Sequence, residues 1–201
     1  MNEEFDCNKN YILEDDIALL RPLEQKDYNN LLPFASQEPD LWKYSLISAA
    51  GDTGMRAYID TAVQARKEGK EYAFIVLDKR TNQYAGSTRF YDIQAAFKTL
   101  QLGYTWYGKD FQGTGLNKHC KFLLLSFVFE QVGIERVEFR ADNNNERSIA
   151  AMKSIGCKVD GVLRGNMPTR EGGRRDSIVL SILKDEWFAD VKEKLKEKLS
   201  K

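Results

Sequence analysis

Residues 104–117 combine aromatic side chains, three glycines and two side-chain amides in a pattern suited to binding phosphate. The segment reads Tyr-Thr-Trp-Tyr-Gly-Lys-Asp-Phe-Gln-Gly-Thr-Gly-Leu-Asn. We expect a strand that runs into a turn, with an apolar helix over 118–130 after it. The start of a helix leaves backbone N–H groups unpaired, and its dipole favours negative charge there. Because Gly113 and Gly115 have no side chain, a phosphate or pyrophosphate can approach the backbone closely.

The spacing of these residues disfavours the two best-known phosphate loops. A P-loop would end in Gly-Lys-Ser or Gly-Lys-Thr, and a Rossmann turn would read Gly-x-Gly-x-x-Gly. The pattern that remains is Gln112-x-x-Gly115-x-Asn117. It resembles the Arg/Gln-x-x-Gly-x-Gly/Ala loop by which GNAT acetyltransferases hold the pyrophosphate of acetyl-CoA.

A second polar segment follows the next expected strand. Residues 136–142 alternate apolar and polar side chains, which is the period of a strand. Asn145 suits the N-cap of the helix that follows, and Gly156 suits the residue just past its end. This Asn-x-x-Ser stretch, with a glycine eleven residues after the asparagine, resembles the second GNAT signature. In that family the asparagine bonds the pantetheine arm of the cofactor, and the short helix flanks the thioester.

The resemblance to GNAT enzymes extends over most of the chain, from about Tyr11 to Trp187. It implies an α/β fold in one domain over 11–187, with a central mixed, mostly antiparallel sheet and helices on both faces. Residues 1–10 are expected to be loosely ordered, and residues 188–201 to be the end of a C-terminal amphipathic helix. Three segments resemble the subgroup related to ribosomal-protein N-terminal acetyltransferases, namely residues 17–23, 102–106 and 174–183.

The resemblance also implies a reaction and a set of site residues. An amine acceptor, on a small molecule or a protein N-terminus, would attack the acetyl-CoA thioester directly in a ternary complex. The expected catalytic residues are Tyr107, whose backbone N–H would stabilise the oxyanion, and Ser148, the hydroxyl candidate for protonating the thiolate. The expected cofactor-binding residues are Trp106, Tyr107, Gln112, Gly113, Thr114, Gly115, Leu116, Asn117, Asn145 and Ser148.

Three positions depart from what relatives usually carry. Asn117 stands where the loop usually has glycine or alanine. Met152, seven residues after Asn145, occupies the position of a tyrosine that protonates the thiolate in many relatives. Gln101 occupies the stretch in which some relatives place a glutamate base. Candidate bases acting through water are Glu138 and Asp142.

These departures keep other functions open. A non-catalytic acyl-CoA sensor or scaffold would bind CoA without turnover. An unrelated nucleotide-binding α/β protein would prefer ATP or NAD to CoA. Trp42 and Tyr44 lie in a region that shapes the acceptor pocket in the family, although plain packing would also account for them. The sequence indicates neither the acceptor nor whether the chain forms a homodimer.

The composition restricts the class of protein and its partners. The chain has 201 residues, of which 42% are hydrophobic and 30% charged, as expected for one soluble globular domain. Its 30 basic and 30 acidic residues give a formal net charge of zero, so we expect no nucleic-acid partner. The longest apolar stretch, 122–129, is too short to cross a membrane, and no membrane partner is expected.

The cysteines and the single histidine offer little further chemistry. Cys7, Cys120 and Cys157 form no CxxC pair, so no metal site is expected. Together with the lack of a signal peptide, they indicate a cytoplasmic location. Cys120 and Cys157 are expected to be inert core thiols. His119 is expected to be a packing residue rather than a base.

Hydrophobic periodicity predicts the elements that must position the two signatures. Strands are expected at 17–23, 72–78, 84–91, 100–107, 136–142, 157–164 and 175–183. Helices are expected at 25–36, 53–69, 114–131, 145–155 and 185–199. One stripe of the last helix would consist of Phe188, Val191, Leu195 and Leu199.

Overall fold

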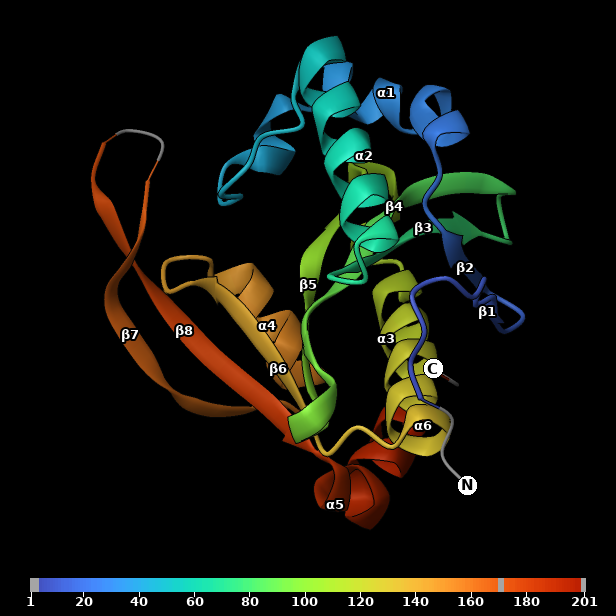
Figure 1. The fold of residues 1–201 in the computed structure, drawn as a ribbon, viewed down its shortest axis with the longest axis vertical. Coiled ribbons are helices and arrows are strands. Elements are labelled where there is room, and N and C mark those ends of the chain that lie inside the picture. Colours follow the sequence, from blue (N-terminus) through green and yellow to red (C-terminus); the bar gives the residue numbers. More distant parts are fainter. Residues whose placement is uncertain (1–3, 170–171, 200–201) are drawn as a thin grey trace.

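The computed structural model describes residues 4–169 and 172–199. Within them, one eight-stranded sheet has the order β1-β2-β3-β4-β5-β6-β8-β7 (Figure 1). Its strands are β1 (Leu13–Glu14), β2 (Ala18–Pro22), β3 (Tyr72–Asp78), β4 (Gln83–Gln94), β5 (Thr99–Tyr107), β6 (Arg136–Asp142), β7 (Lys158–Pro168) and β8 (Arg174–Leu183). The α-helices are α1 (Tyr28–Gln37), α2 (Gly51–Lys67), α3 (Leu116–Ser126), α4 (Glu146–Ser154), α5 (Lys184–Glu186) and α6 (Lys192–Leu199).

Strand β3 shows how the sheet is covered on both faces. Ala73 and Ile75 pack in a cluster with residues of α1 and α2. Phe74 and Val76, which alternate with them, pack in a second cluster with residues of α3, α4 and α6. A strand buried on both faces reads as a continuous apolar run, as β3 does. The predicted mixed, mostly antiparallel sheet with helices on both faces is therefore confirmed.

Strands β5 and β6 are the one parallel pair among the described strands, and they separate along their length. Their pairing covers only Thr99–Gln101 of β5 and Arg136–Glu138 of β6. Beyond these pairs, β5 continues to Tyr107 beside β4, and β6 continues to Asp142 beside β8. We call this divergence the splay; it lies in the middle of the sheet (Figure 1).

A β-bulge interrupts β5 beside the splay. Ser87 of β4 pairs with Trp106, whereas Arg89 pairs with Gly103. Between these two pairs β5 therefore has one residue more than β4. Tyr104 lies inside the bulge with a φ of 49°, a left-handed conformation that is uncommon for a bulky residue. The bulge therefore changes the direction of β5 just before Trp106 and Tyr107.

The C-terminal helical segment buries a different set of residues from the one expected. Trp187, Val191 and Leu195 are buried, whereas Phe188 is 54% exposed. Between α5 and α6 the chain forms a π-turn over Trp187–Val191, which widens the helix by one residue per turn. Trp187 consequently faces the core, where its ring stacks on Phe129. The prediction that Phe188 lies on the apolar stripe is wrong.

The N-terminal segment is partly packed on the core. Phe5 stacks on Tyr11 with ring centroids 5.3 Å apart, and it contacts Phe90 edge to face. Cys7 is buried. Residues 4–10 thus differ from the loose order expected for 1–10, because aromatic side chains anchor them; residues 1–3 and 200–201 lie outside the described residues.

Candidate active site

A cavity of about 910 Å³ lies at the splay. Its walls come from β5, the loop after β5, the start of α3, β6 and α4, so both sequence signatures meet there. The predicted cofactor-binding residues that line it are Trp106, Tyr107, Gln112, Gly113, Gly115, Asn117, Asn145 and Ser148. Two predicted residues do not line it: Leu116 is fully buried in the core, and Thr114 supports the loop from behind.

The loop between β5 and α3 has the conformation that its glycines suggested. Gly113 and Gly115 have φ values of 77° and 87°, which favour glycine strongly. A Cβ atom built on either residue would meet no other atom within 4 Å. Gly115 is the N-cap of α3. The Leu116 N–H donates to the Thr114 hydroxyl at 3.5 Å, and the Lys118 N–H donates to the Gly115 carbonyl at 2.8 Å. This leaves the Asn117 N–H as the donor of the first turn. The loop therefore offers a donor beside open space.

Tyr107 presents its main-chain polar groups to the splay. The Gly108 N–H donates to the Ala85 carbonyl of β4 at 3.0 Å, so the intervening Gly86–Tyr107 pair is of the non-hydrogen-bonded type. The N–H and C=O of Tyr107 accordingly point away from β4. Gln112 Nε2 donates to the Tyr107 carbonyl at 2.6 Å. Gln112 thus fixes the end of β5, while the Tyr107 N–H points into the splay.

The side chains of Trp106 and Tyr107 serve as core residues on opposite faces of the sheet. Trp106 packs edge to face against Trp42, with centroids 4.9 Å apart, and its indole N–H donates to the Tyr58 hydroxyl at 3.3 Å. Tyr107 packs in the α3-side cluster with Cys120. The strand end is therefore anchored on both faces, which leaves its main chain to serve the cavity.

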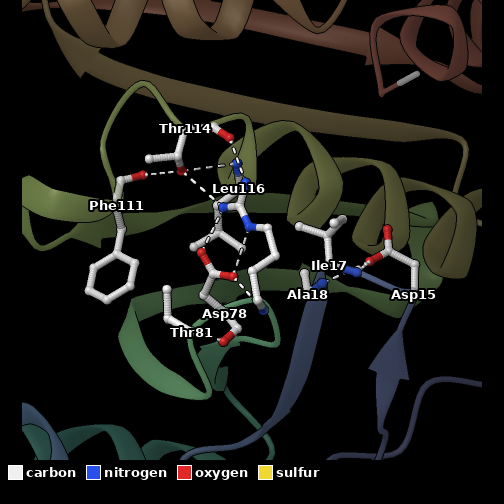
Figure 2. A network of polar contacts seen from close by, with 9 residues as sticks. Asp15, Ile17, Ala18, Asp78, Thr81, Phe111, Thr114 and Leu116 are labelled. Carbon is white, nitrogen blue, oxygen red and sulfur yellow. Dashed lines mark hydrogen bonds and ion pairs between the residues drawn. The ribbon is translucent and has the colours of Figure 1, made fainter. Parts of the chain in front are cut away.

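A network behind the loop was not foreseen from the sequence (Figure 2). Asp78 is buried at the end of β3, and Arg80 in the following turn donates to it from Nη2 at 2.6 Å and from Nε at 2.9 Å. Arg80 Nη1 also donates to the Thr114 carbonyl at 3.0 Å, and the Thr114 hydroxyl donates to the Phe111 carbonyl at 2.8 Å. The β3–β4 turn therefore braces the loop at 112–117. Arg80 and Thr114 are 34 residues apart in the sequence, so only the folded chain brings them into contact.

The same ion pair makes the brace dependent on pH. Hydrogen bonds from Arg80 hold the pKa of the Asp78 carboxyl below its ordinary value. Because the folded pKa is lowered, the pair stabilises the protein above the ordinary carboxyl pKa. This contribution is lost as the pH falls through the folded value.

Replacing Arg80 with methionine is expected to weaken acetyl-CoA binding about tenfold and to lower the free energy of unfolding by about 1–2 kcal/mol. The change leaves the Asp78 carboxylate without its main donor and releases Thr114. Calorimetric titration and thermal melts measure the two effects. Arg56→Met, which removes an exposed ion pair with Asp52 on α2, is the matched control and should change neither. Wild-type affinity in Arg80→Met would show that the loop needs no brace.

The second signature forms the helix cap that the sequence predicted. Asn145 Oδ1 accepts a hydrogen bond from the Ser148 N–H at 3.1 Å, which leaves its Nδ2 amide as a donor beside the cavity. Gly156 follows α4 with a φ of 104°, as predicted for a residue just past a helix end. Ser148 is half-buried, and Met152 lies one turn further along α4 in the same cavity wall.

The carboxylates differ in their access to the cavity. Glu138 accepts from Arg140 Nε at 2.7 Å and from Arg136 Nη2 at 3.2 Å, and it is not among the lining residues. Asp142 does line the cavity. Asp92 also lines it, and its Oδ2 accepts from Gln101 Nε2 at 2.7 Å. Asp92 was missed because only the β4–β5 register brings it beside Gln101.

Neither the histidine nor the cysteines belong to the site. Asp15 Oδ2 lies 2.7 Å from His119 Nδ1. The other carboxylate oxygen of Asp15 accepts from the N–H groups of Ile17 and Ala18 (Figure 2). Burial raises the pKa of the Cys120 thiol to about 12 and raises that of Cys157 as well. The prediction that these two thiols lie in the core is confirmed.

The far wall of the cavity comes from the segment after α1. Trp42 is almost fully buried, whereas Tyr44 is 38% exposed, and both line the cavity. Arg175 of β8 donates to the Tyr44 carbonyl at 2.9 Å, which links the C-terminal part of the sheet to this segment. Trp42 is thus a packing residue at the rim, and Tyr44 is available for contact.

Comparison with known proteins identifies the family. The family described as the acetyltransferase (GNAT) domain matches residues 18–158, which is more than half of the chain. The chain belongs to the GNAT family. GNAT proteins are acyltransferases that use acetyl-CoA, so an unrelated nucleotide-binding protein is no longer an alternative.

Individual relatives agree with the GNAT assignment. The GNAT chain is 26% identical over 172 residues to the "Putative ribosomal N-acetyltransferase YdaF" of Bacillus subtilis (strain 168), covering 84% of this chain and 92% of the relative. A crystal structure of a GCN5-related N-acetyltransferase from Brucella melitensis is 26% identical with a TM-score of 0.86, covering 95% and 86% of the two chains. Mycobacterium smegmatis RimJ in complex with CoA-disulfide has a TM-score of 0.79 at 16% identity, covering 94% and 93%.

Neither a metal-binding cluster nor a membrane-spanning helix is found among the described residues of the GNAT chain. Among residues 4–169 and 172–199, no group of three or more His, Cys, Asp or Glu side chains is placed to hold a metal ion. No helix in the same ranges has the length and apolar character needed to span a membrane.

Proposed function

We propose that this GNAT protein transfers the acetyl group of acetyl-CoA to a primary amine, on a small molecule or a protein N-terminus, by direct attack in a ternary complex. The observation that carries the proposal is the cavity at the splay, which is lined by both the loop at 112–117 and the cap at 145–148. The subgroup resemblance and the similarity to YdaF, a putative ribosomal N-acetyltransferase, favour a protein N-terminus as the acceptor.

The residues around the cavity suit a CoA thioester. Open space above Gly113 and Gly115 and the Asn117 N–H in the first turn of α3 suit a pyrophosphate. Asn117 Oδ1 is buried without a protein partner, so it is available to accept from the ligand. The outward-facing N–H of Tyr107 and the Asn145 Nδ2 amide suit the amide-rich pantetheine arm.

The acetyl transfer itself needs a neutral amine and a stabilised oxyanion. The Tyr107 N–H would donate to the oxygen that becomes negative as the amine attacks. Asp92, held by Gln101, would attract the acceptor ammonium and take its proton, directly or through water. Asp92→Asn is expected to lower kcat/KM about tenfold, with Glu138→Gln as the control that leaves it unchanged. Equal rates in Asp92→Asn and the wild type would remove Asp92 from the reaction.

Thermal shift with acetyl-CoA, CoA, ATP and NAD tests the proposed donor. A ligand at a hundredfold excess over its Kd stabilises the native state by about 2.7 kcal/mol. We expect selective stabilisation by acetyl-CoA and CoA, followed by release of free thiol when a suitable amine or N-terminal peptide is added. A response to ATP or NAD alone would overturn the proposal. Stabilisation by acetyl-CoA without thiol release for any amine or peptide would favour the sensor function.

A further inference from the structure

Lys121 is a buried amine in the wall of the cavity. It lies on α3 with only 5% of its surface exposed, and it lines the cavity at the splay. Its Nζ donates to Thr105 Oγ1 at 2.8 Å and to Thr88 Oγ1 at 3.1 Å. Within residues 4–169 and 172–199, no carboxylate forms an ion pair with it. Burying an unpaired cation costs free energy, and a negative charge that forms next to it would offset this cost.

The surroundings of Lys121 make its proton easy to lose. Burial lowers the pKa of Lys121 to about 8. The titratable groups that face it are the thiols of Cys120 on the same helix and Cys157 before β7, both of which burial keeps protonated. Its hydrogen-bond partners, Thr88 and Thr105, are neutral. The ammonium form therefore exists near neutral pH without a countercharge.

The position of Lys121 connects it to the expected thioester. Its partner Thr105 lies between the bulge at Tyr104 and the outward-facing main chain of Tyr107. Lys121 shares the cavity wall with Ser148 and Met152 of α4. The Lys121 amine is thus held beside the part of β5 where the acyl donor would lie. It is opposite α4, the helix that would flank the sulfur of the CoA thioester.

We propose that Lys121 protonates the sulfur of CoA as it leaves. This inference rests on the proposed acetyl transfer. The acceptor nitrogen forms a bond to the acetyl carbon, the carbon–sulfur bond breaks with its electron pair on sulfur, and Lys121 Nζ gives its proton to that sulfur. The acceptor amine loses one proton to its base and water, and the neutral lysine regains one from solvent, so the charges balance.

Two other groups in the cavity wall are weaker candidates for this step. The Tyr107 hydroxyl is fully buried near Cys120, and burial raises its pKa well above that of an ordinary tyrosine. Ser148 is an alcohol, and a proton donor works best when its pKa lies near the working pH. Lys121 meets that condition and also brings positive charge to a developing thiolate.

Variants of Lys121 separate proton transfer from binding. Lys121→Met is expected to lower kcat about 100-fold while the calorimetric Kd for acetyl-CoA stays unchanged. Lys121→Arg keeps a charge that does not titrate in this range, so the fall of kcat above about pH 8 in the wild type should disappear. Lys153→Met, on the exposed surface of α4, is the control and should behave as the wild type. Wild-type kcat in a folded Lys121→Met protein would overturn the proposal.

A readout without turnover keeps the test valid if Lys121→Met fails to fold. Ultraviolet absorbance of the thiolate reports the pKa of the CoA thiol in its complex with the wild-type protein. We expect that pKa to lie below the value for free CoA, because the Lys121 ammonium stabilises the thiolate, and we expect Lys121→Arg to preserve the shift. A bound thiol that titrates like free CoA would overturn the proposal. Failure of CoA to bind at all would instead overturn the proposed function.

Discussion

Replacement of Gly86 by alanine is expected to lower the free energy of unfolding by about 3 kcal/mol and to abolish measurable acetyl-CoA binding. Gly86 lies on β4 directly opposite Tyr107, and a Cβ atom there would come within 2.0 Å of the Trp106 carbonyl oxygen. That oxygen belongs to the backbone and cannot move aside without the strand. Accommodating one methyl group must therefore push the end of β5 out of place, and with it the main chain that faces the splay.

Urea denaturation and calorimetric titration at a temperature well below the melting point measure the two effects of Gly86→Ala. Gly161→Ala on β7 is the matched control, because this strand glycine has no atom within 4 Å of a built Cβ. Gly161→Ala should leave the free energy of unfolding unchanged or raise it by at most about 1 kcal/mol. Acetyl-CoA affinity close to that of the wild type in Gly86→Ala would contradict the role given to the end of β5.

Replacement of Gly115 by valine is expected to weaken acetyl-CoA binding by about 100-fold. The left-handed φ of 87° disfavours a branched residue, and the side chain would project into the open space above the loop. A pyrophosphate held at that space would lose one or two charge-assisted hydrogen bonds, each contributing about 1.5–3 kcal/mol, and 1.4 kcal/mol corresponds to a tenfold change in Kd.

The control for Gly115→Val must carry the same backbone strain away from the cavity. Gly69, just after α2, has a φ of 70° and open space at its Cβ position. Gly69→Val should therefore lower the melting temperature by an amount similar to Gly115→Val and leave the Kd for acetyl-CoA unchanged. Equal Kd values for the two variants would show that the loop does not hold the phosphates.

The elements with strong local signals could be predicted from the sequence. Strand β6 was predicted at its observed bounds, and the Asn145 cap and the Gly156 helix end were identified because each rests on the chemistry of one residue in its own turn. The turn at Gly113 and Gly115 was located for the same reason, since glycine is the residue that most readily adopts a left-handed backbone. The GNAT resemblance then supplied the topology that local patterns do not contain.

The features that escaped prediction depend on contacts between distant segments. Arg80 braces Thr114 from a turn 34 residues away, and Asp92 reaches Gln101 only through strand register. No local pattern marks Lys121, because its burial follows from how α3 packs on β4 and β5. Phe188 was wrongly predicted to lie on the buried stripe, because a π-turn shifts the helical period. No single residue in the sequence indicates that shift.

The splay also gives the sheet two edges in its interior. An exposed edge strand invites pairing with another chain, and proteins normally protect such edges. Here the unpaired margins of β5 and β6 face each other, with β4 and β8 already bound on their outer sides. The unpaired groups of β5 and β6 are thus recessed within the sheet rather than set at its outer edge, where pairing with another chain leads to aggregation.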